Sequence, residues 1–482
     1  MTGLAAHDSV DDDEFPDRVS SNGVNPRTGR YAIKAPSIAE LCAVATGDPM
    51  SKSEVQQAKA AWLQKSQHLG VGYGVDPNSL QQAGWGAVFA ANDPHVTEKR
   101  ARLAQLLGLR EKESGPLYKE FFGDNGLRAD ETGRAFLARF GDAEGPVRVD
   151  RVPYYLLLVG SPAEIPFSVQ TELHSRHAVG RVDFETLDAL EQYANGIVAR
   201  VIDNVSVAKS AVFFATTNAD DQNTERSARE LAGPLANSLA TKRPGWKVEQ
   251  QFREQASKQS LVNLLNARTH PSLLMTASHG LALDASDEMQ REWQGALVTS
   301  EWPGPADTER AMTVDEFFAA TDVAPDANLN GMIALFFACF GGGTPRYDEF
   351  LPLEDRTLHS LAPSPFVARL PQRLLIAGAS AVIAHVERAW SCSFSRPGAG
   401  VQIHAFEEAM LKLADGWRVG AAVDALNTKC NEIAGSLASA LRDRQFGKMN
   451  DDEIAELVLT RTDAANFIIL GDPAARLSFD AQ

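Results

Sequence analysis

Short apolar runs recur along residues 206–482, and each run ends in polar residues or glycine. Stretches with helical spacing of apolar residues separate several of these runs. Strands that alternate with helices form parallel sheets, because right-handed crossovers return the chain to the same edge. The pattern predicts an α/β fold with a doubly wound, mostly parallel sheet and flanking helices. Its strands are expected within residues 211–215, 246–252, 273–280, 329–339, 379–390 and 467–470, the last completing an edge of the sheet.

A smaller α/β unit is predicted before this one. Residues 85–91 form an apolar run, the turn Asn92-Asp93-Pro94 follows, and residues 96–107 have helical spacing. This order is typical of a βα unit, and another apolar run begins at residue 154. We therefore expect three parts in the chain: a disordered acidic lead (1–30), an N-terminal helical and α/β subdomain (31–205) and a larger α/β domain (206–482).

The acidic lead has little apolar surface to bury. Its carboxylates stand among Ser, Gly, Pro and Asn, a composition typical of a solvated tail. A removable pro-segment is the alternative interpretation. The acidic residues are Asp8, Asp11, Asp12, Asp13 and Glu14.

Composition narrows the class of protein. The 482 residues carry a net charge of −17, which argues against a broad electrostatic surface for nucleic acid. Four cysteines, Cys42, Cys339, Cys392 and Cys430, are too few for a disulfide framework and lack metal-site spacing. The start lacks the pattern of a signal peptide, and no run reaches the ~18 apolar residues of a membrane span. We expect a cytoplasmic protein without a metal, a cofactor, a nucleic-acid partner or a membrane contact.

A thiol and an imidazole stand at the ends of two predicted strands. Cys339 ends one apolar run and is followed shortly by three glycines, and His279-Gly280 ends another. Parallel sheets place their chemistry at the carboxyl ends of strands. A free thiol has a pKa of about 8.5, so a nucleophilic cysteine needs a neighbouring base. The amides of Gly280 and Cys339 are candidate donors for an oxyanion.

Plainer interpretations stay open. A cysteine in an apolar strand is usually a core residue, and a His-Gly pair is usually a turn. His385 competes with His279 on position alone, but His279 precedes the cysteine and has the adjacent glycine. Cys392 lies in a polar Ser-Cys-Ser stretch and is interpreted as a bystander.

Two short motifs resemble the catalytic core of the caspase-like cysteine peptidases: Ser278-His279-Gly280 and, after it, Ala338-Cys339-Phe340-Gly341. This group includes the bacterial CHAT-domain proteases, and the resemblance is greatest to its gingipain type. Residues 154–167 and 178–193 are similar to the segment by which gingipain-type peptidases enter their catalytic unit, and residues 466–477 are similar to their closing strand and Gly-Asp-Pro turn. The resemblance implies a caspase-like catalytic domain, with His279 as general base or acid and Cys339 as nucleophile. Many such enzymes use this dyad without a third carboxylate. It also implies a smaller α/β subdomain before the catalytic one.

The resemblance also implies where the substrate residue before the cut would bind. The loop after the first catalytic strand carries Asp220 and Asp221, and the loop after residue 385 carries Glu387 and Trp390. Carboxylates in this pocket would favour arginine or lysine. The alternatives are a solvated turn at Asp220-Asp221 and an ion pair between Glu387 and Arg388.

The first functional hypothesis is a cysteine endopeptidase that cuts protein or peptide substrates after Arg or Lys. By analogy it is a regulated bacterial effector in defence or cell death, switched on by an upstream protease or a regulatory partner. A catalytically idle caspase-like scaffold that binds a protein partner is the alternative. Acyl transfer to a small molecule is a third class.

Overall fold

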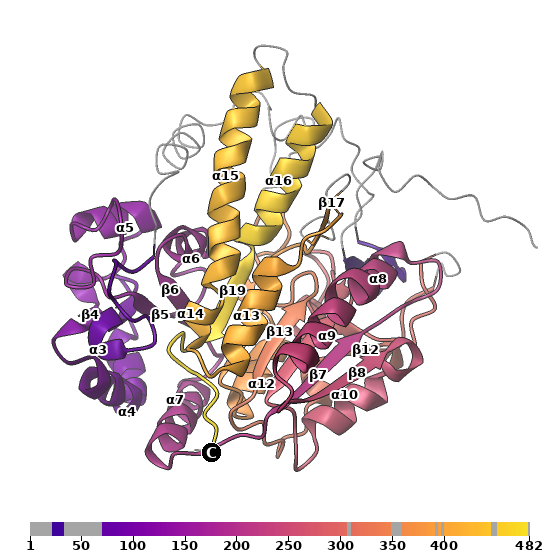
Figure 1. The fold of residues 1–482 in the computed structure, drawn as a ribbon, viewed down its shortest axis with the longest axis horizontal. Coiled ribbons are helices and arrows are strands. Elements are labelled where there is room, and N and C mark those ends of the chain that lie inside the picture. The colour runs from indigo at the N-terminus through magenta and orange to yellow at the C-terminus, as the bar shows by residue number, and fades with distance from the viewer. Residues whose placement is uncertain are drawn as a thin grey trace, which may run out of the picture.

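The computed structural model describes residues 22–32, 70–305, 310–348, 359–390, 394–396, 400–444 and 451–480. A ten-stranded sheet crosses the molecule in the order β4-β3-β5-β6-β19-β16-β13-β9-β7-β8, with helices on both faces (Figure 1). The predicted α/β class and the mostly parallel, doubly wound sheet are therefore confirmed. Among the described residues, no helix has the length and apolar content to cross a membrane.

Five parallel strands form the half of the sheet that holds the predicted thiol and imidazole. The central ones are buried along their whole length, as the continuous apolar runs predict. β8, at the outer edge, consists mostly of polar residues and contains no buried residue, which suits an edge strand. These strands are β8 (Lys247–Phe252), β7 (Ser210–Ala215), β9 (Leu273–Ala277), β13 (Ile333–Phe337) and β16 (Ala381–His385).

The other half is a second parallel block of opposite direction. β19 runs antiparallel to β16 and parallel to β6, so the direction of the sheet reverses between β19 and β16. The expectation of β19 at a sheet edge is wrong. All five of its residues are buried, because strands cover both of its sides. This block comprises β4 (Tyr118–Phe121), β3 (Trp85–Phe89), β5 (Tyr155–Val159), β6 (Ala178–Val182) and β19 (Phe467–Gly471).

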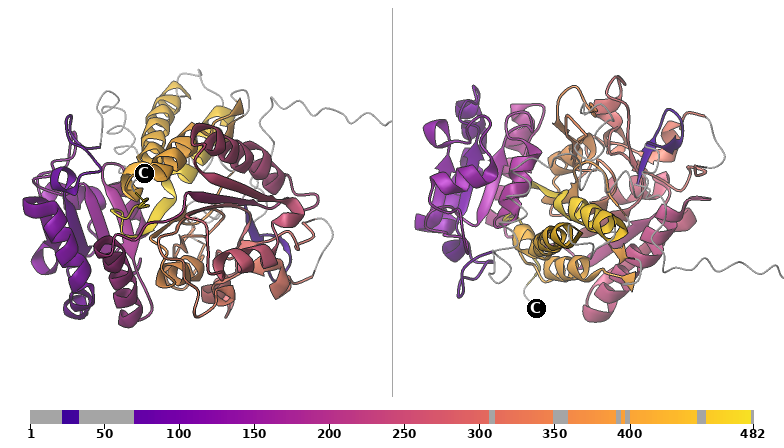
Figure 2. Two further views of the ribbon diagram at one scale, coloured as in Figure 1. Left: turned by 60° about the horizontal axis from the view of Figure 1, so that its bottom comes forward. Right: turned by 90° about the horizontal axis from the view of Figure 1, so that it is seen from above.

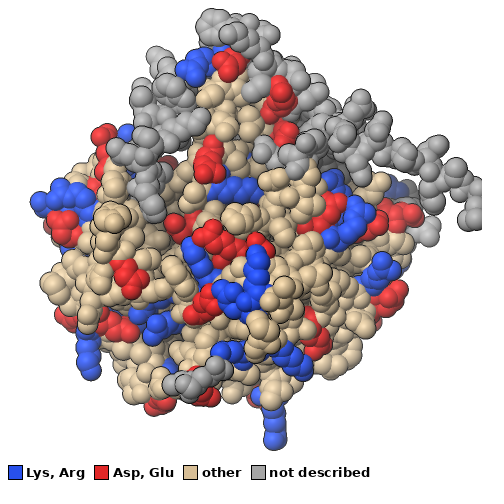
Figure 3. Space-filling view, in the orientation of Figure 1, with Lys and Arg blue, Asp and Glu red and all other residues tan. Residues whose placement is uncertain are grey.

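Helices cover the two faces of the sheet, and α15 and α16 pair and project beyond it (Figure 1). Charged residues of both signs are interspersed on the face in Figure 3. The helices are α3 (Leu80–Ala83), α4 (Val96–Ser114), α5 (Gly133–Arg139), α6 (Phe167–His174), α7 (Leu187–Ile202), α8 (Gln222–Arg226), α9 (Gly233–Lys242), α10 (Lys258–Leu265), α11 (Gln290–Trp293), α12 (Arg369–Ile376), α13 (His404–Ala414), α14 (Val419–Ala422), α15 (Asp424–Arg444) and α16 (Asp451–Ala465).

Asp472, directly after β19, ties this last strand to the N-terminal block. Its buried carboxylate accepts from the guanidinium of Arg110 at 2.6 and 2.8 Å and from the indole of Trp85 at 3.0 Å. Its own amide donates to the hydroxyl of Tyr193 at 2.6 Å. The Gly-Asp-Pro turn thus connects α4, β3 and α7 to the end of the chain.

A segment near the N-terminus belongs to a second, smaller sheet. This sheet has the order β12 (Phe317–Phe318), β11 (Leu297–Val298), β10 (Gly280–Leu281), β1 (Gly23–Asn25) and β2 (Arg30–Tyr31). Figure 2 shows this indigo segment against the half of the molecule that holds β9 and β13. Residues 22–30, expected within a disordered lead, are therefore ordered here, because β10 offers them an edge to pair with. Residues 1–21 and 33–69 lie outside the described part of the chain.

Candidate active site

The strand ends of β9 and β13 bring His279 and Cys339 to one place. Ala277 is the partner of Phe337 in the parallel pair, and Ser278 N–H donates to the carbonyl of Phe337 at 3.2 Å. His279 lies two residues after Ala277, and Cys339 lies two residues after Phe337. Both side chains are fully buried. A Cβ at Gly280 would lie 1.9 Å from the carbonyl oxygen of Cys339, so this close approach requires glycine.

A buried carboxylate orients the imidazole. Nε2 of His279 lies 2.6 Å from Oδ2 of Asp221, and neither side chain has exposed area. Thr224 donates its hydroxyl to the same carboxylate at 2.7 Å. Burial opposes ionisation of Asp221, but the charge and hydrogen bond of His279 and the hydroxyls of Tyr31 and Thr224 hold its pKa below the ordinary value. Asp221 is therefore an anion at neutral pH.

This pairing determines the roles of the two ring nitrogens. Because Asp221 is an anion, Nε2 is the ring nitrogen that donates a hydrogen bond to it. Nδ1 is buried without a hydrogen-bond partner among the described residues. In the neutral form of the ring, Nδ1 is therefore the nitrogen that can act as a base, and it belongs to the strand end next to that of Cys339.

Two aromatic residues enclose the His279 ring. Tyr31 donates its hydroxyl to Oδ1 of Asp221 at 2.7 Å, and its ring centroid lies 5.5 Å from that of His279. Trp302 meets the imidazole edge-on at 5.3 Å. Burial and the nearby charge of Asp221 raise the pKa of Tyr31, which therefore stays a protonated donor. The imidazole is held by contacts on several sides.

The thiol has a polar environment despite its burial. Ala389 N–H donates to Sγ of Cys339 at 3.2 Å. Arg388 lies close by and is held by Asp348 at 2.7 and 3.2 Å and by Glu387. Burial opposes the charge of Arg388, but Glu387, Asp348 and the charge of Cys339 raise its pKa. A donor and a cation near sulfur favour the thiolate.

The backbone around Cys339 adopts uncommon conformations. Phe340 has a φ of 58° and Glu387 a φ of 71°. Phe340 N–H donates to the carbonyl of Glu387 at 2.5 Å, and Gly342 N–H donates to the carbonyl of His385 at 2.7 Å. These bonds join the loop after β13 to the loop after β16. Left-handed non-glycine residues cost free energy and cluster at functional sites.

The expected pocket residues lie in different surroundings. Asp220 is exposed with a φ of 53°, whereas the Asp221 carboxylate faces His279. Glu387 pairs with Arg388, which was the alternative interpretation. Trp390 is fully buried, and its backbone N–H donates to Oδ1 of Asp463 at 2.5 Å. Since the carboxylates of Asp221 and Glu387 bind groups of the protein itself, the structure does not gather the four residues around an open acidic pocket.

His385, the competing histidine, belongs to the core. Its ring lies 3.8 Å from that of Phe467 and 5.2 Å from that of Phe337, and Nε2 is 3.3 Å from a carboxylate oxygen of Asp463. Cys392 and Cys42 lie outside the described residues, and Cys430 is partly buried on α15.

Residues 22–32 pass directly across the candidate site. The carbonyl oxygen of Asn22 accepts from Gly280 N–H at 2.8 Å, and Asn22 N–H donates to the carbonyl of Ala389 at 3.1 Å. A Cβ at Gly23 would lie 3.4 Å from Sγ of Cys339. These contacts could not be predicted from the sequence, because they join residues more than 250 positions apart.

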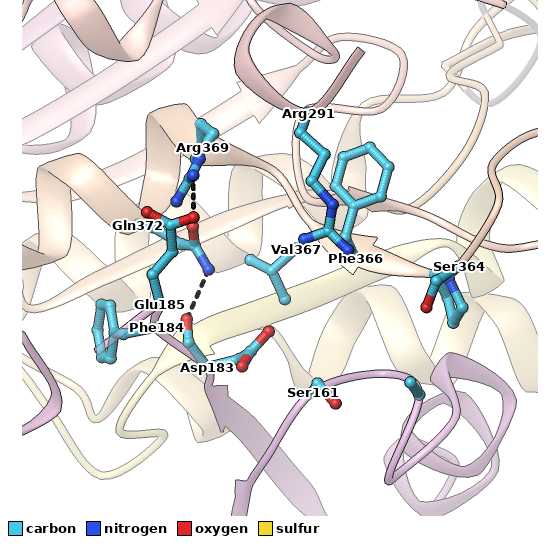
Figure 4. A pocket seen from close by; sticks show the side chains of 12 residues that line it. Ser161, Asp183, Phe184, Glu185, Arg291, Ser364, Phe366, Val367, Arg369 and Gln372 are labelled. Atoms are coloured by element: carbon cyan, nitrogen blue, oxygen red, sulfur yellow. Dashed lines mark hydrogen bonds and ion pairs between the residues drawn. The ribbon is translucent and has the colours of Figure 1, made fainter. Parts of the chain in front are cut away.

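A cavity of 330 Å³ is lined by Asp183, Arg291 and Arg369 among others, and not by Cys339 or His279 (Figure 4). Another, of 280 Å³, is lined by Gly23, Phe340 and other residues next to the candidate site. Across the residues described, no group of three or more His, Cys, Asp and Glu side chains could hold a metal ion.

No protein-family model and no curated protein matches the chain. Among solved structures, it is similar to the Porphyromonas gingivalis complex of RgpB pro- and mature domains, with 14% identity, a TM-score of 0.47, and coverage of 82% of this chain and 80% of that one. A structure described as a protease has 10% identity, a TM-score of 0.46 and coverage of 83% and 80%. The Saccharomyces cerevisiae separase–securin complex has 9% identity, a TM-score of 0.30 and coverage of 66% and 15%. Similarities this low carry no functional argument, so the function is argued from the site.

Proposed function

We propose that this protein is a cysteine endopeptidase with Cys339 as nucleophile and His279 as general base and acid. One observation carries the proposal: the buried Asp221 carboxylate binds Nε2 of His279 and leaves the lone pair of Nδ1 at the strand end next to that of Cys339. A nucleophile, a base and a group that orients the base are the parts that acyl transfer requires.

The reaction follows from these parts. Nδ1 of His279 takes the thiol proton, and Sγ of Cys339 attacks the carbonyl carbon of the substrate. The amides of Gly280 and Cys339 hold the oxyanion. His279 protonates the leaving amine, and it then activates the water that hydrolyses the thioester. Asp221 stabilises the imidazolium that forms in both half-reactions, so the proposed site has a third member that the dyad expectation did not include.

The proposed cleavage after arginine or lysine requires an available carboxylate near the candidate site. It rested on Asp220, Asp221 and Glu387, but Asp221 and Glu387 are already partnered by His279 and Arg388. A desolvated cation needs an available anion, so a basic preference now depends on Asp220 alone. Peptide profiling separates these cases, since a preference for an uncharged residue would remove the basic pocket from the proposal.

The wider role is proposed from the resemblance. It is a regulated effector protease of a bacterial defence or cell-death pathway, with an upstream protease or a partner protein as its trigger. The few scattered cysteines support a reducing, cytoplasmic location. Burial of His279 and Cys339 supports regulation, because a covered site needs an opening step.

The test compares the purified protein with its Cys339→Ala variant on a mixed fluorogenic peptide library, before and after limited proteolysis. Cleavage by the wild type that disappears in the variant is expected. Equal cleavage by both would show that another residue is the nucleophile.

A catalytically idle scaffold is the second candidate, and the cover formed by residues 22–32 favours it. In that case Cys339 would not react with a peptide-like electrophile even after the cover had been removed.

A further inference from the structure

We propose that the Asn22–Gly23 peptide bond is the protein's own substrate, bound in the candidate site for cleavage after asparagine. This inference rests on the proposed function and adds to it a specific bond and a residue preference. It uses the described segment 22–32 and its contacts with the loops after β9, β13 and β16.

The carbonyl group of Asn22 lies where a reacting carbonyl should lie. Its oxygen accepts from Gly280 N–H at 2.8 Å, and this amide is one of the two donors assigned to the oxyanion. An oxyanion site stabilises the transition state when its donors point at the oxygen of the bond to be cut. The carbonyl of Asn22 is therefore the group in this chain that is aligned for attack.

The thiol lies beside the same bond. A Cβ on Gly23 would be 3.4 Å from Sγ of Cys339, which is van der Waals distance, so sulfur lies next to Gly23. Ala389 contacts both partners: its carbonyl accepts from Asn22 N–H at 3.1 Å, and its N–H donates to Sγ at 3.2 Å. One residue thus aligns the peptide and the nucleophile with each other.

The chain after the bond is bound as a β-strand. β1 pairs in parallel with β10, Gly23 with Gly280 and Val24 with Leu281, and Ala282 N–H donates to the carbonyl of Val24 at 2.8 Å. Strand addition is a common way to hold an extended peptide. Tyr31 on β2 then donates its hydroxyl to Asp221, the partner of the proposed base His279. This hydrogen bond anchors the segment at a second point.

The side chain of Asn22 indicates the preference. It is fully buried, and neither its Oδ1 nor its Nδ2 has a hydrogen-bond partner among the described residues. A neutral amide tolerates such an enclosure better than an ionised side chain, whose burial without a partner costs far more. The space before the bond therefore suits asparagine rather than aspartate, arginine or lysine.

The cleavage step balances with water as co-substrate. The bond from Sγ to the carbonyl carbon of Asn22 forms, and the bond from that carbon to the nitrogen of Gly23 breaks. The thiol proton passes through His279 to the Gly23 amine. Water then splits the thioester, restores the thiol and leaves a carboxylate on Asn22. The products are residues 1–22 and 23–482.

The experiment follows the full-length protein and its Cys339→Ala variant by intact mass and N-terminal sequencing during incubation. The wild type is expected to lose residues 1–22 at a rate independent of protein concentration, since the bond is cut within one chain, and the variant is expected to stay whole. Equal cleavage of both would indicate spontaneous chemistry at an Asn-Gly bond and overturn the inference.

Two matched substitutions test the preference. Asn22→Asp places an unpaired charge in the enclosure and should slow self-cleavage by about 100-fold or more. Asn328→Asp makes the same change at an exposed position outside the bound segment and keeps the acceptor that Asn330 N–H uses at 3.1 Å, so its self-cleavage should match the wild type. Equal rates for both variants would overturn the proposed preference.

A peptide substrate separates the two proposals. Wild-type protein that hydrolyses peptides but never cuts itself would overturn the inference and leave the proposed function in place. If the wild type cleaves neither peptides nor itself before and after limited proteolysis, both proposals fail.

Discussion

Asp221 and His279 form a fully buried pair whose distance of 2.6 Å leaves no room for water between them. In such a pair the carboxylate determines which imidazole nitrogen carries the proton. An amide in place of the carboxylate can equally accept a hydrogen bond from the ring through its oxygen or donate one to it through its NH₂ group. The orientation of the base therefore depends on the charge of Asp221 and not on its shape alone.

The first prediction is that Asp221→Asn lowers kcat by about 100- to 10,000-fold. The reason is that the amide permits the wrong tautomer and stabilises the imidazolium poorly. KM should change little, because Asp221 touches no substrate. Steady-state kinetics on a peptide substrate measure both constants, with the exposed Asp203→Asn as control. A raised KM with unchanged kcat would instead support the pocket role first expected for Asp221.

The second prediction concerns stability against pH. The pKa of Asp221 is lower in the folded protein than its ordinary value of 3.8. The ionised carboxylate therefore stabilises the fold fully above pH 3.8, and this stabilisation is lost as the pH falls through the pKa of the folded protein. The difference in free energy of unfolding between wild type and Asp221→Asn should decrease over the same pH range. Urea unfolding at pH 6 and at pH 3 measures it, and a difference that grows in acid would contradict the assignment.

Sequence reasoning at the residue scale located the two strand ends correctly but did not predict the contact between Asp221 and His279. Apolar runs that stop at His279 and Cys339 predicted that the two residues lie side by side. Asp221 was singled out, but the sequence does not tell whether a carboxylate after a strand faces the substrate or a histidine. That depends on the turn geometry and on Tyr31, which comes from a segment 190 residues away.

At the scale of elements, β19 and the turn after it are the main link between the two parallel blocks. Arg110 and Asp472 are both buried, with 1% and 0% of their side chains exposed. Breaking a buried pair leaves one uncompensated charge. Much of the stability at this junction therefore depends on one carboxylate.

The third prediction is that Asp472→Ala lowers the free energy of unfolding by about 3–5 kcal/mol. Arg110 would stay buried without its anion, and the indole of Trp85 would lose its acceptor. Urea titration followed by far-ultraviolet circular dichroism measures the change. The exposed Asp480→Ala is the control, and equal midpoints for the two variants would contradict the role of this turn.

The positions of most strands could be predicted from the sequence, but the order of the strands in the sheet could not. Fully buried parallel strands are continuous apolar runs, and such runs predicted β5, β7, β9, β13 and β16. A run such as residues 467–470 contains no information on which strands will flank it. The placement of β19 inside the sheet depends on two exposed strand edges, at β6 and β16, that exist only in the folded protein.

At the scale of the whole molecule, the N-terminal segment lies against the buried thiol. Tyr31 fixes β2 to Asp221, and Asn22 and Gly23 lie at Gly280 and Cys339. Sequence reasoning assigned Asn22 and Gly23 to a solvated lead, because an acidic neighbourhood and a short run reveal nothing about a pairing partner more than 250 residues away.

The fourth prediction is that Tyr31→Ala speeds alkylation of Cys339 by iodoacetamide about tenfold or more, since a looser segment opens more often. Peptide mapping by mass spectrometry measures the rate. Cys430 on α15 serves as an internal control whose rate should not change. If both cysteines react faster, the substitution has loosened the whole fold rather than the cover.

The position of β19 also has a consequence for how the protein is made. Translation proceeds from the N-terminus, so residues 467–471 are added after the other nine strands of the sheet, yet they fill its fifth place. Before β19 is added, β6 and β16 each lack one neighbouring strand. β16 then pairs with β13 alone, and the loop that follows β16 is the one whose Ala389 contacts the thiol. A chain made only as far as residue 466 would therefore carry His279 and Cys339 without a completed sheet beneath them, so the proposed peptidase activity would require β19.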